Sequence, residues 1–233
     1  MTNLENNNNL IFKTKEEYEK WIYSQDWYQT IILSEDLITP GKQPTDKRLK
    51  NFNKIDFTGK SVLDVGCNSG QYCLYAKENG ASLVVGIDPD PKRISQAQIL
   101  AANQGLQIDF NISDINVIKE YGKFDIVLCI AVLTEIKDII NSLSLLRDVT
   151  EETAIIEMGL AKPLIYLSKN RRWFRRDKSV TRIGRVGEFH RHKHTGWVFY
   201  PTLEIVQDIF GSDFYVQYKG RGVRYDIIYA SRK

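Results

Sequence analysis

A glycine-containing turn followed by an isolated acid carries the clearest chemistry of this sequence. The stretch Val62–Gly70 reads VLDVGCNSG, so an apolar run ends at Asp64 and glycines follow at once. Glycine lets the backbone approach a ligand closely, and a helix that starts after such a turn presents free N–H groups. Asp88 ends the next apolar run, where a carboxylate suits a bidentate hydrogen bond to ribose hydroxyls. The pattern predicts a site for a ligand that contains a nucleoside.

The spacing of this turn excludes two common kinds of nucleotide site. It is not the G-x-G-x-x-G of dinucleotide-binding proteins, and no G-K-[ST] follows to hold phosphates. An alternative explanation is that Asp64 and Asp88 only cap the helices that follow them and that the glycines are ordinary turn residues. Cys67 and Cys73, in and after the same stretch, are more typical of small packing residues than of nucleophiles.

Four titratable residues further along are candidates for acid–base chemistry. Glu135 follows the fourth predicted strand, and the chain's three histidines fall in one alternating motif, Glu188-x-His190-x-His192-x-His194. In an extended strand this alternation directs the Glu188 side chain and the three histidines to one face, a geometry that suits proton transfer or metal binding. A solvated basic strand is the alternative, and we predict no metal.

The charged residues are distributed unevenly. The chain holds 32 Lys and Arg and 29 Asp and Glu, a net charge of +3, yet residues 169–193 carry ten basic and two acidic side chains, +8 against −5 elsewhere. The centre of this basic segment reads Arg171-Arg172-Trp173-Phe174-Arg175-Arg176. Such clustering favours an anionic partner, which is either RNA, a phosphate or carboxylate of a small acceptor, or the anionic surface of a membrane. Solvated charge without a partner is the alternative.

Short apolar runs that alternate with helical patterns must position these residues. The predicted strands are Ser61–Val65, Leu83–Ile87, Ile108–Ile112, Phe124–Ile130 and Thr153–Met158. The predicted helices between them are Gln71–Glu78, Pro91–Asn103 and Asp138–Asp148. This order favours a parallel sheet with helices on both faces. At the end of the chain, Phe214–Tyr218 and Tyr225–Ala230 flank Lys219-Gly220-Arg221-Gly222 and predict an antiparallel hairpin.

The residues before the first strand predict a separate cap. Residues 2–9 are polar and include four consecutive asparagines, so we predict a disordered tail over residues 1–13, and residues 14–57 predict a helical and extended cap. The cap begins with the capping box Thr14-Lys15-Glu16-Glu17, continues through the extended stretch Trp27–Leu33 and ends in a helix over Asp46–Asn53. No apolar run is long enough to cross a bilayer, no secretory signal opens the chain, and the three cysteines lack metal-ligand spacing. We therefore expect a cytoplasmic protein with reduced thiols.

The combination resembles the class I S-adenosylmethionine-dependent methyltransferases, whose first motif D/E-x-G-x-G-x-G appears as Asp64–Gly70. Asn68 replaces the middle glycine, and asparagine tolerates the left-handed conformation that such a turn needs. The resemblance implies an α/β, Rossmann-like fold over residues 58–233, with a mostly parallel seven-stranded sheet and a C-terminal antiparallel hairpin. It implies S-adenosylmethionine as cofactor. The implied cofactor residues are Asp64, Gly66, Cys67, Asn68 and Gly70 for the methionine portion, Asp88 and Pro89 for the ribose, Asp114 and Ile115 for the adenine, and Ile130 and Ala131 over the methionine carboxylate and amine.

A narrower resemblance rests on Trp27-Tyr28-x-x-Ile31 with Thr39-Pro40-Gly41 and on Val198–Thr202. It also includes Val62–Gly70, Val85–Pro89 and Phe124-Asp125-x-Val127 with Val132-Leu133. These segments are similar to the family of the tRNA wobble-uridine methyltransferase that uses carboxy-S-adenosylmethionine. That enzyme has Tyr-His where this chain has Thr134-Glu135, and its tyrosine helps to recognise the extra carboxylate. The substitution implies ordinary S-adenosylmethionine. The family's Arg-Lys-Gly-Pro segment is also not recognisable.

The sequence therefore predicts a methyltransferase that acts on an oxygen or nitrogen of an anionic small-molecule or saccharide-like acceptor. The sulfonium already activates the methyl group, so the protein must place the acceptor in line at ~3 Å and remove its proton if it is a hydroxyl. A basic lid at about residues 160–200 would hold the acceptor, and the predicted substrate residues are Tyr28, Arg171, Arg172, Arg175, Arg176 and Tyr200. The alternatives are a tRNA wobble-uridine-modifying enzyme and a non-catalytic S-adenosylmethionine-binding protein. The pattern predicts no oligomeric state.

Overall fold

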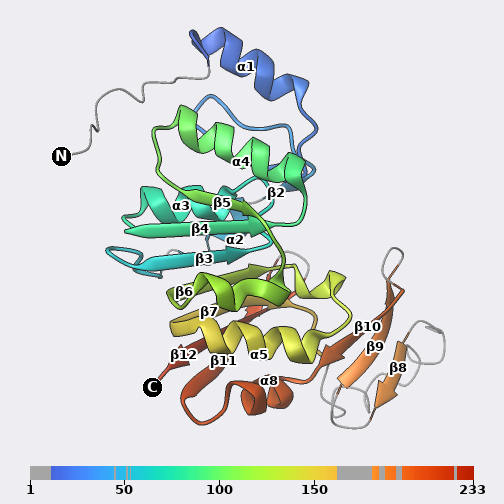
Figure 1. Ribbon diagram of the computed structural model, residues 1–233. Coiled ribbons are helices and arrows are strands. Elements are labelled where there is room, and N and C mark those ends of the chain that lie inside the picture. The colour runs from blue at the N-terminus through green and yellow to red at the C-terminus, as the bar shows by residue number, and fades with distance from the viewer. Residues whose placement is uncertain are drawn as a thin grey trace. The chain divides into compact units, whose positions relative to one another are not determined.

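The computed structural model describes residues 12–44, 46–50, 52, 54–161, 180–183, 187–192, 196–222 and 225–233 (Figure 1). The chain divides into two units, Met1–Asp114 and Ile115–Lys233. Side chains are described for most of these residues, but not for 44, 46, 47, 180–183, 187–192, 196–198 and 221. The predicted division into a tail, a cap and a main domain with a lid stays a prediction.

The first unit opens with helix α1 (Lys15–Ser24), which begins as the capping box predicts. The Oγ1 atom of Thr14 accepts from the N–H of Glu17 at 3.2 Å. The Glu17 carboxylate, however, accepts from the N–H of Lys13 at 2.8 Å rather than from that of Thr14. Helix α2 (Asp46–Leu49) is shorter than predicted, because the N–H of Phe52 bonds to the carbonyl of Leu49 and closes a tight turn.

Between these helices the chain doubles back on itself. Strands β1 (Gln29–Thr30) and β2 (Gln43–Pro44) pair in parallel. A Cβ atom on Gly41 would lie 2.0 Å from the backbone of Gln29, so only glycine fits the Thr39-Pro40-Gly41 turn. Trp27 is buried, and its Nε1–H donates to the carbonyl of Ile22 at 2.7 Å.

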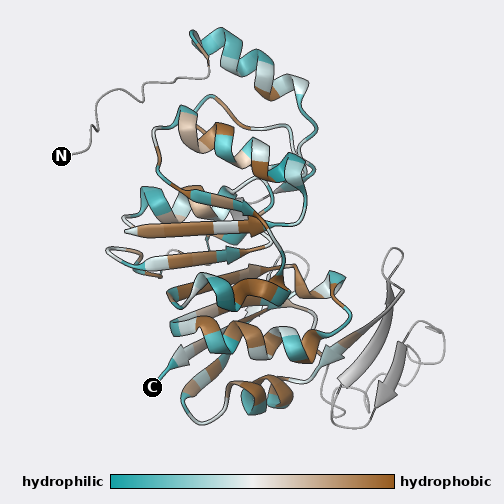
Figure 2. Ribbon diagram, in the orientation of Figure 1, coloured by the Kyte–Doolittle hydropathy of each residue, from teal (hydrophilic) through white to brown (hydrophobic). Residues whose placement is uncertain are grey.

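Three parallel strands joined by two helices form the rest of the first unit. In chain order they are β3 (Ser61–Val65), α3 (Gln71–Glu78), β4 (Leu83–Asp88), α4 (Pro91–Asn103) and β5 (Asp109–Ile112). Their register pairs Val65 with Ile87 and Asp88 with Ile112, so the carboxyl ends of the strands lie along one edge. Figure 2 shows β4 as a nearly continuous hydrophobic run, as expected of a strand covered on both faces.

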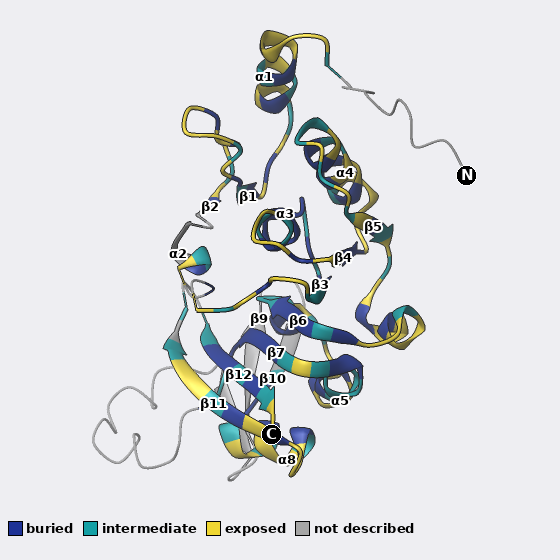
Figure 3. Cartoon of the chain, turned by 90° about the vertical axis from the view of Figure 1, so that its left-hand side faces the viewer, coloured by how far each residue is buried: buried dark blue, intermediate teal, exposed yellow. Residues whose placement is uncertain are grey.

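The second unit holds an antiparallel hairpin next to two parallel strands. Its elements are η1 (Ile115–Tyr121), β6 (Phe124–Ile130), η2 (Leu133–Glu135), α5 (Ile139–Val149), β7 (Thr150–Met158), α8 (Leu203–Phe210), β11 (Phe214–Arg221) and β12 (Asp226–Arg232). Strand β7 runs parallel to β6 and antiparallel to β12, which pairs with β11. The strands β6 and β7 are mostly buried and β12 is buried in part, whereas the edge strand β11 exposes Tyr215 and Tyr218 (Figure 3).

The predicted fold class is confirmed. The seven strands β3–β7, β11 and β12 make a mostly parallel sheet that ends in an antiparallel hairpin. Three strands were not predicted: β8 (Val180–Ile183), β9 (Gly187–His192) and β10 (Gly196–Pro201) form a separate antiparallel sheet. They lie in the predicted insertion, where the alternation of Glu188, His190 and His192 indicated extended backbone but no sheet. Within the described residues, no helix has the length and apolarity that crossing a bilayer requires.

Candidate cofactor and acceptor sites

The turn after β3 has the backbone geometry that its glycine motif predicts. Gly66, Asn68 and Gly70 have φ angles of 73°, 52° and 85°, all in the left-handed region. Asn68 thus takes the left-handed conformation expected where the motif has its middle glycine. The N–H of Gly70 bonds to the carbonyl of Cys67 at 2.9 Å and closes the turn before α3 begins. The N–H groups of residues 66–70 are all hydrogen-bonded within the turn or to the end of β4, so the turn has a fixed shape.

Asp88 at the end of β4 holds this turn in place. Its Oδ2 atom accepts from the N–H of Asn68 at 2.9 Å, and its Oδ1 atom accepts from the N–H of Asp90 at 2.9 Å. The N–H groups of Gly66 and Cys67 also bond to the carbonyl of Ile87, at 2.8 and 2.9 Å. A carboxylate offers about four acceptor positions, so Asp88 retains capacity for ribose hydroxyls. Burial raises the pKa of Asp88, and the two backbone hydrogen bonds oppose that rise.

Neither acid caps the helix that follows it, so the alternative explanation fails for both. Helix α3 begins after Gly70, which makes no side-chain capping bond. Helix α4 is capped by Asp90, whose side chain accepts from the N–H of Lys92. Asp64 and Asp88 therefore need another role.

Asp64 is a buried carboxylate, and only one of its two oxygens has a hydrogen-bond partner among the described residues. It is 1% exposed, and its Oδ2 atom accepts a weak hydrogen bond from the Cys73 thiol at 3.4 Å. Its Oδ1 atom has no hydrogen-bond partner in the part of the chain that the structure describes. Burial raises the pKa of Asp64 to about 7, and the nearby Asp88 charge adds to that rise. A positively charged ligand group at Oδ1 would remove both the unpaired oxygen and the penalty on the charge.

Two glycines let the aromatic ring of Phe110 pack beneath the turn. A Cβ atom on Gly70 would lie 2.9 Å from the Phe110 ring, and one on Gly86 would lie 2.7 Å from it. Sequence reasoning noted Gly86 only as part of the motif that ends at Asp88 and Pro89, and it did not single out Phe110. The signal was present, because a glycine inside a buried strand often marks close approach of another group.

The thiols beside the turn suit packing rather than catalysis. Cys67 and Cys73 are both buried and free. Burial raises the pKa of each thiol, so neither is poised as a thiolate nucleophile. This supports their interpretation as packing residues.

The predicted adenine and ribose positions follow the same strand ends. The N–H of Ser113 bonds to the carbonyl of Asp88 at 3.1 Å, which sets the end of β5 beside the end of β4. Asp114 comes next and is exposed, Ile115 is buried, and Pro89 is exposed. The first unit thus brings Asp64, the turn, Asp88 and Asp114 to one edge of its strands.

In the second unit, the chain turns sharply after β6. Ala131 has a φ of 61°, uncommon for a residue other than glycine, and its N–H bonds to the carbonyl of Glu157 at 2.9 Å. The Thr134 hydroxyl bonds to the carbonyl of Ala131 at 3.2 Å. Strained backbone of this kind clusters at functional sites, which agrees with the role implied for Ile130 and Ala131.

The same unit brings a predicted base and a predicted substrate residue together. Tyr200, at the end of β10, is 8% exposed and packs directly against Gly159. Burial raises the pKa of Tyr200, and Tyr225 and Glu135 nearby raise it further. Like an ordinary tyrosine, Tyr200 is protonated at neutral pH, and the raised pKa extends this to more alkaline solutions. Sequence reasoning missed Tyr225, which lies in the hairpin loop and has no motif around it.

Comparison with known proteins agrees with this geometry. A family model described as a methyltransferase domain matches residues 56–171. The chain carries a class I methyltransferase domain. The cofactor of this family is S-adenosylmethionine, and the residues of the first unit fit it. The unpaired Asp64 oxygen suits an ammonium group, and Asp88 keeps acceptor capacity for hydroxyls.

Two curated proteins are similar to this chain in sequence, and one solved structure is similar to it in fold. The chain is 33% identical over 129 residues to a ubiquinone biosynthesis O-methyltransferase of Coxiella burnetii, covering 53% of this chain and 52% of that protein. It is 30% identical over 94 residues to a tRNA U34 carboxymethyltransferase of Campylobacter hominis, covering 40% and 33%. The N-terminal domain of EvdMO1, solved with S-adenosylhomocysteine and D-fucose, matches 94% of this chain and 97% of that chain, with a TM-score of 0.70 and 13% identity. The chain spans about half or less of the two curated relatives, and the structural likeness shows the fold.

For several residues predicted to bind or deprotonate the methyl acceptor, the structure describes no side chain. Arg171, Arg172, Arg175, Arg176 and His194 lie outside the described residues. His190 and His192 lie on β9, where they pair with Val198 and Gly196 of β10, so the expected extended backbone is present over these two histidines. Tyr28 is 44% exposed in the first unit. Among the described residues, no group of three His, Cys, Asp or Glu side chains could hold a metal ion.

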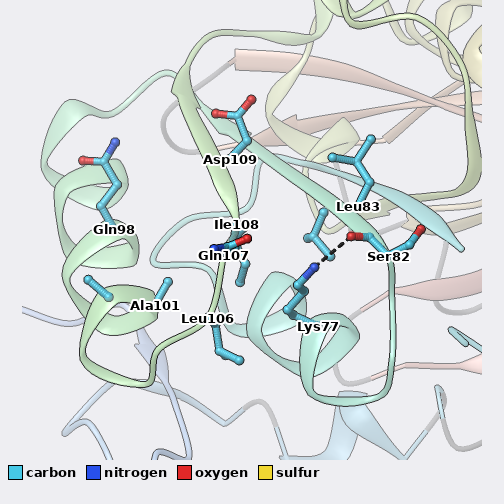
Figure 4. Close-up of a pocket in the computed structure, with 11 residues that line it drawn as sticks. Lys77, Ser82, Leu83, Gln98, Ala101, Leu106, Gln107, Ile108 and Asp109 are labelled. Carbon is cyan, nitrogen blue, oxygen red and sulfur yellow. Dashed lines mark hydrogen bonds between the residues drawn. The ribbon is translucent and has the colours of Figure 1, made fainter. Parts of the chain in front are cut away.

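A pocket of about 570 Å³ lies at the other end of the first unit's strands (Figure 4). Lys77, Leu83, Gln98 and Asp109 contribute to its lining, and the Lys77 ammonium bonds to the carbonyl of Ser82 at 2.8 Å. It sits where β4 and β5 begin, whereas ligands of open α/β sheets bind where the strands end. None of the predicted site residues lines it, and we assign it no role in the reaction.

Replacing Gly159 by alanine should displace Tyr200 and lower activity without weakening cofactor binding. The new Cβ atom would lie 2.3 Å from the Tyr200 ring, so the ring must move. Moving an acceptor-positioning group by about 1 Å can lower the rate on the order of 100-fold. Methyl-transfer rates and S-adenosylhomocysteine titration would measure the two effects.

Gly122→Ala is the matched control for this substitution. Gly122 has a φ of 86° and nothing within 4 Å of its Cβ position, so alanine there is strained but collides with nothing. We expect a stability loss of about 1–2 kcal/mol and unchanged activity. Full activity of the Gly159 variant would contradict the role of Tyr200.

Proposed function

We propose that this chain is an S-adenosylmethionine-dependent methyltransferase that methylates an oxygen or nitrogen of an anionic small-molecule or saccharide-like acceptor. The observation that carries this proposal is the turn itself. Three left-handed residues, the Asp88 brace and the unpaired Asp64 oxygen meet at the ends of parallel strands, in a chain that carries a methyltransferase domain. Neither capping a helix nor closing an ordinary turn would require the buried carboxylates of Asp64 and Asp88.

Each acid of the first unit has a proposed contact with the cofactor. Asp64 faces the methionine ammonium with its free oxygen, Asp88 binds the ribose hydroxyls, and Asp114 accepts from the adenine amino group. In the second unit, the backbone of Ile130 and Ala131 lies over the methionine end. When bound, the cofactor supplies a methyl group on a positively charged sulfur. The task of the chain is therefore to orient the acceptor and to take its proton.

The acceptor side is proposed from the second unit. The acceptor oxygen or nitrogen forms its new bond to the methyl carbon as the carbon–sulfur bond breaks, and the acceptor proton passes to Glu135. Tyr200, whose hydroxyl is protonated at neutral pH, donates a hydrogen bond that orients the acceptor. Tyr28 and the arginines 171, 172, 175 and 176 are proposed to bind the acceptor, the arginines through its anionic group. His190, His192 and His194 are the alternative bases.

Two similar proteins support the choice of acceptor. The Coxiella relative is named as an O-methyltransferase, which favours oxygen as the accepting atom. The EvdMO1 domain was solved with D-fucose, and its fold covers 94% of this chain, which favours a saccharide-like acceptor. The three cysteines are all buried and free, and we propose the cytoplasm as the site of the reaction.

The test is transfer of a radiolabelled methyl group from S-adenosylmethionine to separated pools of sugar phosphates and nucleotide sugars, acidic metabolites, quinones and lipids, and RNA. We expect label in an acid-soluble fraction that an anion exchanger retains, and no label with the Asp88→Ala variant. Binding of S-adenosylhomocysteine without label in any pool would instead support a non-catalytic binding protein.

Transfer to tRNA is the second candidate function. It is favoured by the 30% identity to the Campylobacter tRNA enzyme and by the basic segment around Arg171–Arg176. It predicts ribonuclease-sensitive label and binding that weakens steeply with added salt, because neutralising several phosphates releases bound counterions. The net charge of +3 and a pI near 8.6 are low for a dedicated RNA-binding domain, which is why we rank tRNA second.

A further inference from the structure

Gln96 is a buried polar residue that connects two parts of the first unit. It lies on α4 and is 2% exposed. Its Oε1 atom accepts from the Ser69 hydroxyl at 2.8 Å and from Nη1 of Arg93 at 3.1 Å. Its Nε2 atom donates to the backbone carbonyl of Asp26 at 3.2 Å. One side chain thus bonds both to the cofactor turn and to a segment far earlier in the chain.

The early segment, residues 26–32, is attached at both of its ends, and we call it the strap. At its start, Nη1 of Arg93 also bonds to the Asp26 carbonyl at 2.6 Å, and Nη2 lies 3.5 Å from the Asp26 carboxylate. At its end, the N–H of Ile32 donates to Oε1 of Gln71 at 3.2 Å. Ser69 and Gln71 flank Gly70, so both attachments are made beside the turn.

The bond at Ser69 acts on the most strained part of the turn. Ser69 is fully buried between the left-handed Asn68 and Gly70, and its N–H donates to Oδ1 of Asn68 at 2.9 Å. Asn68 is the residue whose own N–H bonds to Asp88. A substitution at Gln96 can therefore shift the carboxylate of Asp88, because Ser69 and Asn68 connect the two side chains through hydrogen bonds.

We infer that Gln96 is a positioning residue that couples the strap to the cofactor turn, so that binding of the cofactor and order in residues 26–32 depend on each other. The inference rests on the proposed function, since it takes S-adenosylmethionine as the ligand of the turn. Coupling is reciprocal: if the strap stabilises the bound turn, the bound cofactor must stabilise the strap to the same extent. Gln96 itself touches no reacting atom and acts through Ser69 and the Asp26 carbonyl.

Two substitutions at Gln96 separate its bonds. Gln96→Leu removes all of them at nearly the same volume. Gln96→Glu keeps an oxygen for Ser69 and Arg93 but loses the N–H donor to Asp26 and sets an oxygen against that carbonyl. Gln98→Leu is the matched control, because Gln98 is on the same helix and its side chain bonds only to the carbonyl of Phe110 at 3.3 Å in the hydrogen bonds described.

The experiment measures calorimetric binding of S-adenosylhomocysteine together with hydrogen exchange of the strap amides in the full chain. In Gln96→Leu we expect affinity about 10-fold weaker and exchange at Ile31 and Ile32 about 10-fold faster, since each lost hydrogen bond is worth a few-fold to tenfold. Gln96→Glu should speed strap exchange and weaken binding in the same direction. Gln98→Leu should stay within about twofold in both. Bound S-adenosylhomocysteine should slow strap exchange in the wild type, and by less in the two Gln96 variants.

Unchanged affinity in both Gln96 variants would overturn the inference, and so would weakened affinity with wild-type strap exchange. If Gln96→Leu does not fold, Gln96→Glu carries the same test. A wild-type protein that binds no S-adenosylhomocysteine would sink the proposed function instead. A wild type that binds it, with Gln96 variants that bind equally well, would sink only the role of Gln96.

Discussion

Replacing Asp88 by alanine should weaken S-adenosylhomocysteine binding by at least about 100-fold. The substitution removes the acceptor proposed for the ribose hydroxyls and also leaves the N–H of Asn68 without its partner at 2.9 Å. Two hydrogen bonds to a charged group are worth about 3 kcal/mol or more together, which corresponds to two powers of ten in Kd. Calorimetric titration of the folded variant is the measurement.

Asp90→Ala is the matched control for Asp88→Ala. Asp90 lies two residues further on, is exposed, and caps α4 by accepting from the N–H of Lys92. Loss of such a cap lowers stability by about 1 kcal/mol, and we expect cofactor affinity to change by less than about threefold. If both variants bound equally well, Asp88 would not be the ribose residue.

The second large effect is expected at Asp64, where Asp64→Asn should stabilise the ligand-free protein above pH 7. Burial raises the folded-state pKa of Asp64 from 3.8 to about 7, so the folded chain holds this proton more tightly than the unfolded chain does. The contribution of Asp64 to stability is therefore fully present below about pH 4 and is lost as the pH rises through about 7. The loss corresponds to about 4 kcal/mol, and asparagine does not undergo it. Urea unfolding of both proteins from pH 4 to pH 8 measures this difference.

The same titration should make cofactor binding dependent on pH. A methionine ammonium at Oδ1 favours the ionised carboxylate, so binding releases a proton wherever free Asp64 is protonated. We expect the affinity of the wild type for S-adenosylhomocysteine to rise by up to about tenfold per pH unit below pH 7 and then to level off. Asp64→Asn should bind weakly, with the Asp64-linked rise abolished. A wild-type affinity that did not change between pH 6 and pH 8 would contradict both the raised pKa and the proposed contact.

Local signals explain why much of the first unit could be predicted. The helices α3 and α4 have the predicted bounds, because a glycine turn and the Asp90-Pro91 start mark where they begin. The left-handed Asn68 follows from its place in the glycine motif. These features depend on residues that are neighbours in the chain, so a sequence pattern can carry them.

Features that depend on residues far apart in the chain could not be predicted from the sequence. Ser69 and Gln96 are 27 residues apart, and Gln96 and Asp26 are 70 apart, so no periodicity relates them. A glutamine in an amphipathic helix is normally exposed, and only the folded chain shows that Gln96 is buried. Tyr225 is likewise a loop residue whose meaning depends on its approach to Tyr200. The sheet of β8–β10 was missed because its strands span only four to six residues and because its pairing depends on how three separate segments meet.

The three buried thiols allow local opening of the chain to be measured by the rate at which each thiol is labelled. Cys67 and Cys73 lie at the turn in the first unit and Cys129 lies on β6 in the second, all of them buried and free. A disulfide reagent reacts only with an exposed thiolate, so each cysteine must wait until its surroundings open. The rate of labelling at each position, resolved by mass spectrometry, therefore reports the opening free energy of that unit. The chain can be followed in this way without an engineered labelling site and before any acceptor is known.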